Sequence, residues 1–254
     1  AFGVTAGLLD EFGEERVRDT PISEEGFVGA AIGAAWMGER PVVELQFADF
    51  ITCAFDPIVT VAAKTHWRSG QAIPITIRCP TGGGVRGGPF HAGSPEGWFV
   101  GTAGLKVVCP GTVEDAYGLL RAAIEDPDPV LYFEHKRLYR TLRGPAPLPS
   151  HRTPIGPATI ARAGTDVTVV TYGSGVTTAL AAADRVDGTD MLYSSGTTGL
   201  PKGVERALPL TPLGTPDGVS TIGGLLFGFE EGMVYLSPAP LYHAAPLRFS
   251  MAVH

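Results

Sequence analysis

Short apolar strands alternate with helical segments along the first half of the chain, and this alternation restricts the folds open to it. Four stretches have the length and apolar composition of buried strands: 41–47, 74–78, 105–110 and 130–134. Helices are expected over 7–12, over 24–37, from Phe50 or Phe55 to Arg68, over 94–100 and over 113–125. Parallel strands need such helical crossovers between them. The sequence therefore predicts an α/β fold with a doubly wound, mostly parallel sheet.

The segment 19–33 combines a rigid turn with a helix made of unusually small residues. Pro21 forms the turn, Ser23 is placed to cap the helix, and Glu24 and Glu25 occupy its first turn, where carboxylates complement the helix dipole. The helix body is apolar on every side and rich in Gly and Ala, although each Gly weakens a helix by about 1 kcal/mol relative to Ala. This predicts close approach of another backbone or a ligand. Glu24 is either a capping carboxylate or a proton-handling group.

A glycine-rich run follows the second predicted strand, at residues 81–91, and ends at His91. So many glycines do not hold regular structure, so the run is predicted to be a loop. It is either a flexible surface connection or a loop at the carboxyl end of a strand, where open α/β sheets bind ligands. His91 is correspondingly either a surface residue or a functional one.

The composition excludes several functional classes. The 254 residues carry a net charge of -7, which argues against a nucleic-acid partner because phosphate neutralisation needs a basic face. No apolar run reaches the length of a membrane span. Three cysteines, Cys53, Cys79 and Cys109, lie far apart without metal-binding spacing and favour a reducing compartment. We expect a cytoplasmic protein that binds neither nucleic acid nor membrane.

Proline content marks the predicted domain boundary. Residues 1–144 form the first domain, and the proline-rich residues 145–158 form a linker. Residues 159–187 begin a second, incomplete α/β domain, with a strand expected over 166–175 and a helix over 176–185. Residues 188–254 differ in character from the rest and are treated as a fourth segment.

Two patterns in the first segment resemble a known family. The spacing of Glu24, Gly29 and Gly33 resembles the pyrimidine-side signature of thiamine diphosphate enzymes, and residues 16–24 resemble the beta subunit of the decarboxylating component of 2-oxo acid dehydrogenase complexes. The resemblance extends over residues 1–186. It implies a transketolase-like pyrimidine-binding domain followed by the start of a transketolase C-terminal-like domain. Relatives carry a further strand and helix upstream, so we expect a chain truncated at both ends.

The resemblance also implies a reaction and a set of residues. The reaction is oxidative decarboxylation of a 2-oxo acid (pyruvate, branched-chain or acetoin type) with acyl transfer to a lipoyl carrier. Glu24 would hydrogen-bond the aminopyrimidine ring of thiamine diphosphate, Gln46 and Phe50 would surround that ring, and His91 would serve substrate and acyl transfer. Glu24 and His91 are thus the expected catalytic residues.

The resemblance implies that this chain does not act alone. The Gly-Asp-Gly and distant Asn that hold the diphosphate and Mg2+ do not occur in it, and in this family they lie on the alpha subunit. The cofactor would therefore be shared between two chains of an α2β2 heterotetramer that docks on a lipoyl acyltransferase core. The isolated chain is expected to be inactive.

A potassium site of some relatives resembles the turn after the fifth predicted helix. The ion would be bound by backbone carbonyls and one side chain, at Ile75, Ala123, Ile124, Asp126 and Asp128 respectively. The same residues are equally consistent with an ordinary Pro-Asp turn.

The C-terminal segment resembles a different family. Residues 191–203 resemble the phosphate-binding loop of AMP-forming acyl-CoA synthetases, and residues 240–246 resemble a second motif of that family. By this resemblance Thr197, Thr198 and Lys202 would contact ATP phosphates and His243 would line the acyl-adenylate pocket. The chain is therefore interpreted as a chimera joined near residue 187. The alternatives are a fatty-acid-adenylating fragment and an inactive chimera.

Overall fold

The computed structural model describes residues 2–164, 168–183, 192–194 and 202–204. The chain divides into two units, Ala1–Leu180 and Ala181–His254, which are described separately. No helix among the described residues has the length and hydrophobicity needed to cross a bilayer. The boundaries expected at residues 144, 158 and 187 stay predictions.

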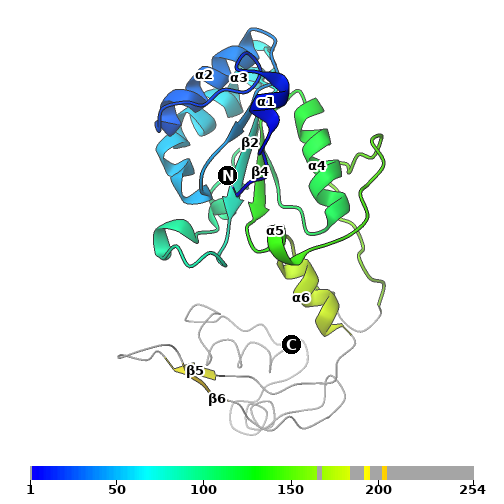
Figure 1. Cartoon of the computed structure of the whole chain (residues 1–254). Coiled ribbons are helices and arrows are strands. Elements are labelled where there is room, and N and C mark those ends of the chain that lie inside the picture. The colour runs from blue at the N-terminus through cyan, green and yellow to red at the C-terminus, as the bar shows by residue number, and fades with distance from the viewer. Residues whose placement is uncertain (1, 165–167, 184–191, 195–201, 205–254) are drawn as a thin grey trace, which may run out of the picture. The chain divides into compact units, whose positions relative to one another are not determined.

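A four-stranded parallel sheet forms the centre of the first unit (Figure 1). Its strands are β1 (Val42–Glu44), β2 (Thr76–Thr81), β3 (Lys106–Val108) and β4 (Val130–His135), in the order β1-β2-β4-β3. Every neighbouring pair is parallel, and β2 pairs along its whole length with β4. The predicted parallel α/β sheet is confirmed. The ends of the four strands lie within two residues of the predicted ones, except that β1 stops three residues early, at Glu44, and β2 extends three residues further, to Thr81.

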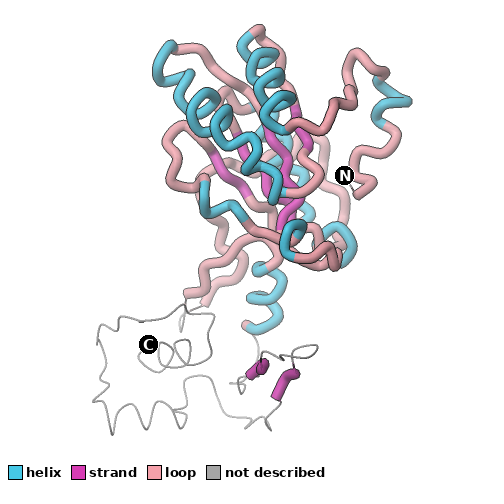
Figure 2. Tube along the Cα trace, turned by 90° about the vertical axis from the view of Figure 1, so that its left-hand side faces the viewer, coloured by secondary structure: helices cyan, strands magenta, loops and turns pink. Residues whose placement is uncertain are grey.

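Helices cover both faces of the sheet. α2 (Glu24–Trp36) and α3 (Ala63–Ser69) lie on one side, and α4 (Val113–Glu125) lies on the other (Figures 1 and 2). Successive residues of β4 point to opposite faces. Leu131 and Phe133 enter the core under α2, whereas Val130 and Tyr132 enter the smaller core that includes Ala123 of α4. A strand buried on both faces is mostly apolar, as β4 is from Val130 to Phe133.

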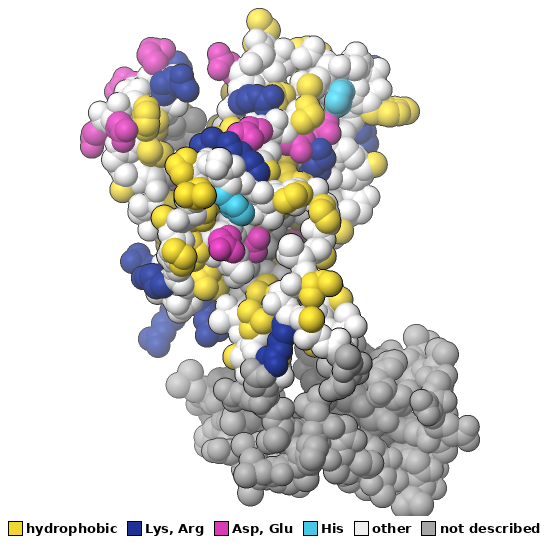
Figure 3. All heavy atoms as spheres, turned by 90° about the vertical axis from the view of Figure 1, so that its right-hand side faces the viewer, with side chains coloured by type: hydrophobic (Ala, Val, Ile, Leu, Met, Phe, Trp, Pro, Cys, Tyr) yellow, Lys and Arg dark blue, Asp and Glu magenta, His cyan; other side chains and the backbone are white. Residues whose placement is uncertain are grey.

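α4 coincides with the prediction because its local signals agree with its packing. Thr112 caps the helix by accepting a hydrogen bond from the Asp115 backbone at 3.0 Å. The Tyr132 hydroxyl donates to the Ala116 carbonyl at 2.6 Å and fixes the helix to β4. Figure 3 views this side of the molecule and shows acidic, basic and apolar side chains interspersed over it, which is typical of a solvated face.

The helix expected from Phe50 or Phe55 to Arg68 is present, and the chain is helical without a break from Ala48 to Ser69, but the type of helix changes along it. A 3-10 helix, η1 (Ala48–Ala54), precedes a π-helical segment, η2 (Pro57–Ala62), and only then does α3 begin. The helix expected over 94–100 is only a 3-10 turn, η4 (Pro95–Trp98).

α2 is less buried than expected. Ser23 stands at the N-cap position, but its side chain makes no capping hydrogen bond. Only Val28, Ile32 and Ala35 of the helix are buried. The exposed Gly29 has nothing within 4 Å of where a Cβ would stand, and Gly33 is equally open. No other described part of this chain approaches Gly29 or Gly33, so the close approach of another backbone or a ligand to these small residues stays a prediction.

The segment beyond β4 packs along α4. A short helix, α5 (Leu138–Thr141), comes first, and Arg152 then bonds Glu125 at 2.6 and 2.8 Å. The strand expected over 166–175 is wrong for its described part, because residues 168–174 are not in a strand and Val170 is 89% exposed. An unpaired segment has no ladder to join. α6 (Gly175–Ala182) follows, close to the predicted helix.

The remaining short elements lie outside the sheet. α1 (Leu8–Phe12) precedes α2, and η3 (Pro89–His91) lies in the glycine-rich loop. In the second unit β5 (Leu192–Ser194) pairs antiparallel with β6 (Lys202–Val204).

Candidate functional site

The carboxyl ends of the strands bring the predicted site residues to one edge of the sheet. Gln46 lies between β1 and η1, Phe50 lies within η1, and His91 lies in the glycine-rich loop that follows β2. Parallel strands end at the same edge, where ligands of open α/β sheets bind. The topology thus gathers residues that are up to 45 positions apart in the sequence.

An aromatic cluster surrounds His91. Its ring lies edge-on to Phe47, with centroids 4.6 Å apart, and edge-on to Phe50 at 5.6 Å. His91 Nδ1 lies 3.0 Å from the Gly87 carbonyl oxygen. Gly87 leaves room for this turn, because a Cβ there would stand 2.7 Å from the Cβ of His91. The structure therefore brings two of the predicted residues, Phe50 and His91, into contact.

Glu24 and Gln46 are available but bond to neither of those two. Glu24 is the first residue of α2, is half-buried, and has no hydrogen-bond or ion-pair partner among the described residues. Gln46 is exposed directly after β1. An unpaired carboxylate, a free amide and an aromatic face are the groups that an aminopyrimidine ring requires. The residues present therefore fit thiamine diphosphate chemically.

A pocket of about 330 Å³ opens beside the aromatic cluster. Phe50, Phe90 and Trp98 supply aromatic walls, and Asp49 and Gly93 supply polar groups. Such a mixture of apolar walls and few polar groups is common in small-molecule sites.

A buried ion cluster beneath this edge was missed by sequence reasoning. Arg78 of β2 donates to Glu44 of β1 at 2.6 Å and to Glu134 of β4 at 2.7 and 3.0 Å. Burial raises the pKa of Glu134, against the opposing charge and hydrogen bonds of Arg78. The available signal was a single carboxylate or guanidinium side chain in each of three largely apolar strands: Glu44, Arg78 and Glu134. Such charges are stable only when they are paired.

Lys136 is a second missed residue. It follows β4, is 2% exposed, and donates to the Pro80 carbonyl at 3.2 Å. Its Nζ lies 5.5 Å from the centre of the Phe47 ring. Burial lowers the pKa of Lys136, and the charges of Asp49 and Glu96 oppose that shift. The cluster around His91 is therefore backed by a buried ammonium group.

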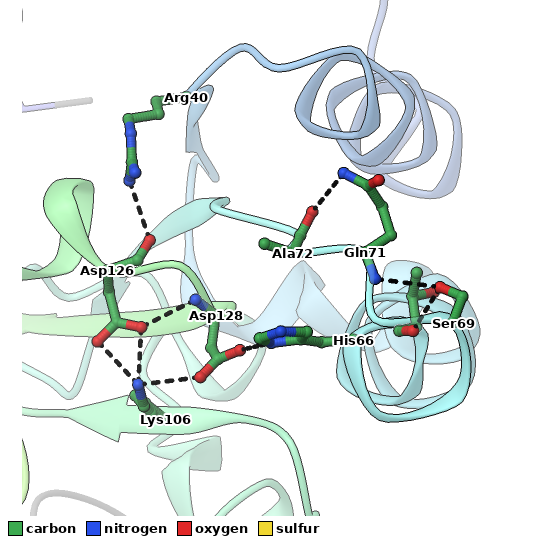
Figure 4. Close-up of polar contacts among 9 residues, drawn as sticks. Arg40, His66, Ser69, Gln71, Ala72, Lys106, Asp126 and Asp128 are labelled. Atoms are coloured by element: carbon green, nitrogen blue, oxygen red, sulfur yellow. Dashed lines mark hydrogen bonds and ion pairs between the residues drawn. The ribbon is translucent and has the colours of Figure 1, made fainter.

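The proposed potassium ligands lie at the opposite end of the strands and already have partners in this chain (Figure 4). Arg40 Nη1 donates to the Ile124 carbonyl at 2.8 Å and to the Asp126 carbonyl at 3.0 Å. The Asp128 carboxylate bonds His66 at 2.5 Å and Lys106 at 3.2 Å.

The two remaining carbonyls are also engaged. Those of Ile75 and Ala123 accept backbone hydrogen bonds from Val130 and Asp126 respectively. Carbonyl and carboxylate oxygens are suitable ligands for K+, but an ion there would share the Ile124 and Asp126 carbonyl oxygens with the Arg40 guanidinium. No cluster of three or more His, Cys, Asp or Glu suited to a metal occurs in the described part of the chain.

Of the four predicted nucleotide residues of the tail, only Lys202 lies in the described part of the chain. Thr197, Thr198 and His243 lie outside the described residues. Lys202 begins β6, a strand of the short antiparallel pair.

Three comparisons relate the chain to known proteins. The family profile described as "Transketolase, pyrimidine binding domain" matches residues 1–141. Over 188 residues the chain is 50% identical to 2-oxoisovalerate dehydrogenase subunit beta of Bacillus subtilis, covering 73% of this chain and 58% of that protein. It is 48% identical to 3-methyl-2-oxobutanoate dehydrogenase subunit beta of Mycobacterium tuberculosis, over 73% and 54% of the two chains.

The similarity extends to a pyruvate dehydrogenase subunit and to a solved structure. Pyruvate dehydrogenase E1 component subunit beta of Staphylococcus epidermidis is 44% identical over 188 residues, 73% of this chain and 58% of that protein. The chain therefore spans between half and three-fifths of the length of these curated relatives. A solved structure titled "Split gene transketolase, inactive beta4 tetramer" matches with a TM-score of 0.58 at 22% identity, over 72% of this chain and 57% of that one, which supports the fold.

Proposed function

The chain belongs to the transketolase pyrimidine-binding family, and on this premise we propose that it is the beta subunit of a thiamine diphosphate-dependent 2-oxo acid dehydrogenase. The observation that carries the proposal is the unpaired Glu24 carboxylate at the start of α2, in a chain half identical to such a subunit. The proposed activity is oxidative decarboxylation of a 2-oxo acid with acyl transfer to a lipoyl carrier. The relatives favour branched-chain 2-oxo acids or pyruvate as substrates.

Different residues of this chain would have different roles around the aminopyrimidine ring. When bound, thiamine diphosphate supplies the electron sink on which decarboxylation depends. Glu24 would hold a proton at a ring nitrogen, Gln46 would hydrogen-bond the ring, and Phe50 would present an aromatic face to it. His91, held against Phe50 at 5.6 Å, would move a proton during acyl transfer.

The open face of α2 supports a partner subunit. Gly29 and Gly33 are exposed with free space above them, so another backbone can approach closely there. The alpha subunit of an α2β2 heterotetramer would supply the diphosphate and Mg2+ site that this chain lacks. A lipoyl acyltransferase core would then receive the acyl group, and the complex would act in the cytoplasm.

A potassium ion would compete with Arg40 for two of the predicted ligand oxygens. The Ile124 and Asp126 carbonyls have the chemistry for K+, but Arg40 already places a positive charge against both. The ion would therefore bind weakly and would need the guanidinium to move aside.

For residues 188–254 we retain the chimera proposal, on the motifs at 191–203 and 240–246. A peptide map across residues 183–196 of the natural protein tests the join. ATP–pyrophosphate exchange with fatty acids tests the alternative adenylating activity, and a clear signal would favour that alternative.

Substitution of Glu24 tests the main proposal. The chain is co-expressed with a cognate alpha subunit, thiamine diphosphate, Mg2+ and a panel of 2-oxo acids. Glu24→Gln should reduce decarboxylation by about 10²–10⁴-fold while the subunits still assemble. The matched control is Glu25→Gln, which alters the exposed neighbouring acid and should retain activity. Wild-type rates in assembled Glu24→Gln would remove Glu24 from the mechanism.

A further inference from the structure

The loop that carries His91 is tied to the rest of the domain at Gly93. The Gly93 backbone N–H donates to Asp49 Oδ1 at 2.9 Å. The Gly93 carbonyl accepts from the Gly82 backbone at 2.8 Å and from the Thr81 hydroxyl at 3.2 Å. A Cβ at position 93 would stand 2.5 Å from Asp49 Oδ1, so a residue with a side chain would push the carboxylate away. Asp49 and Gly93 therefore fit each other closely.

Asp49 also lies next to the aromatic rings that hold His91. It is in η1 between Phe47 and Phe50, whose rings contact His91 at 4.6 and 5.6 Å. One carboxylate thus joins the segment that carries both rings to a loop position two residues after His91. Any shift of Gly93 would be passed to His91 through this short connection.

The second oxygen of Asp49 shows that this arrangement has a cost. Oδ2 is buried and has no hydrogen-bond partner in the described part of the chain. An unpartnered buried oxygen destabilises the folded state, and more so when it carries charge. The buried ammonium of Lys136 offsets part of that cost, because it lies within electrostatic range of Asp49. Asp49 therefore does not serve stability alone: its bonded oxygen holds Gly93, while its other oxygen stays buried without a partner.

We propose that Asp49 is a positioning residue for His91: its hydrogen bond to Gly93 holds the loop so that the imidazole stays against Phe47 and Phe50. The inference rests on the proposed function in one respect, since His91 is assigned to acyl transfer there. The anchoring of the loop itself does not depend on that assignment. The competing explanation is that Asp49 serves only as a counter-ion for Lys136.

Two substitutions separate these explanations. Asp49→Asn removes the charge but retains an oxygen that accepts from Gly93, whereas Asp49→Ala removes both. Gly93→Ala breaks the same hydrogen bond from the loop side and leaves the Asp49 charge in place. Asp56→Ala is the control, because Asp56 is an exposed acid just beyond η1 without a hydrogen bond among the described residues.

Hydrogen exchange of the full chain is the first measurement. In Asp49→Ala and Gly93→Ala, the peptide covering residues 82–94 should exchange about tenfold faster or more, with residues 113–125 of α4 unchanged. Asp49→Asn and Asp56→Ala should exchange like the wild type. Fast exchange in Asp49→Asn, or wild-type exchange in both Asp49→Ala and Gly93→Ala, would overturn the inference.

Half-reaction kinetics with the alpha subunit are the second measurement. Asp49→Ala should lower kcat for acyl transfer to a lipoyl carrier about tenfold or more, with decarboxylation measured by an artificial electron acceptor reduced less than about threefold. Asp49→Asn should restore acyl transfer. A loosened loop with normal acyl transfer would refute the role proposed for His91 and leave the anchoring intact. Equal loss in both half-reactions, not restored by Asn, would refute positioning.

Discussion

Replacing Arg78 with methionine should destabilise the parallel sheet more than any single surface change. Arg78 joins three neighbouring strands through Glu44 and Glu134, and its side chain is only 6% exposed. Methionine fills much of the same space but carries no charge. The substitution would therefore leave Glu134, 10% exposed, without its guanidinium partner.

The expected loss is about 3–5 kcal/mol at neutral pH, the usual cost of removing one partner from a buried ion pair. Substituting Glu134→Leu as well should recover part of the stability, because the pair is then replaced by apolar groups.

The pH dependence of the free energy of unfolding gives a second test of the role of Arg78. Burial raises the pKa of Glu134, so its contribution to stability is present below the ordinary carboxyl pKa and is lost as pH rises through the folded value. Arg78 opposes that rise. Without Arg78 the pKa of Glu134 in the folded protein lies higher still. Lowering the pH from 7 to 5 should therefore reduce the difference in the free energy of unfolding between the variant and the wild type.

Urea unfolding followed by circular dichroism measures the free energies. The control is Arg121→Met, which removes an exposed guanidinium 3.8 Å from Glu125 and should cost less than about 0.5 kcal/mol. A loss below about 1 kcal/mol for Arg78→Met, or a gap that widens on acidification, would refute the reasoning.

Three other changes have equally definite outcomes. Gly104→Ala should lower the free energy of unfolding in urea by at least about 2 kcal/mol, because Gly104 has φ +92° and a Cβ would overlap the Ala63 carbonyl. The control is Gly97→Ala, where the space is open and the change should be less than about 1 kcal/mol. The pKa of Asp128 lies below its usual value, because hydrogen bonds from His66 and Lys106 outweigh the opposing effect of burial. Asp128→Asn should therefore lower the melting temperature at pH 7. The difference from the wild type should vanish as the pH falls below the pKa of Asp128 in the folded protein. Arg40→Gln should make the melting temperature rise more steeply with K+ at constant ionic strength than the wild type does, and identical K+ responses would exclude competition at the Ile124 and Asp126 carbonyls.

Where local signals agreed with burial, the sequence was a sufficient guide. α4 begins after Thr112 and ends at Glu125 as predicted, because its cap and its apolar face specify the same boundaries. The breakdown of the helix near Pro57 into 3-10, π and α pieces was not predictable, since it depends on how η1 packs against α2 and β2. The strand expected over 166–175 failed for a similar reason, because a strand needs a neighbour that pattern alone does not supply.

The candidate site divides in the same way. The family resemblance suggested Glu24, Gln46, Phe50 and His91 as site residues, and only the fold placed the rings of Phe50 and His91 in contact. The roles of Arg78, Lys136 and Asp49 became visible only in three dimensions, because each depends on partners 34 to 89 residues away in the sequence or on burial.

The amino-acid sequence by itself determined the class of fold and the segments that form strands, because hydrophobic period and helix signals act over a few residues. Tertiary structure decided which charges are paired, which glycines are crowded, and that the small-residue face of α2 stays open. These properties depend on distances between segments far apart in the chain, and the dielectric and steric cost of each group is set by those neighbours.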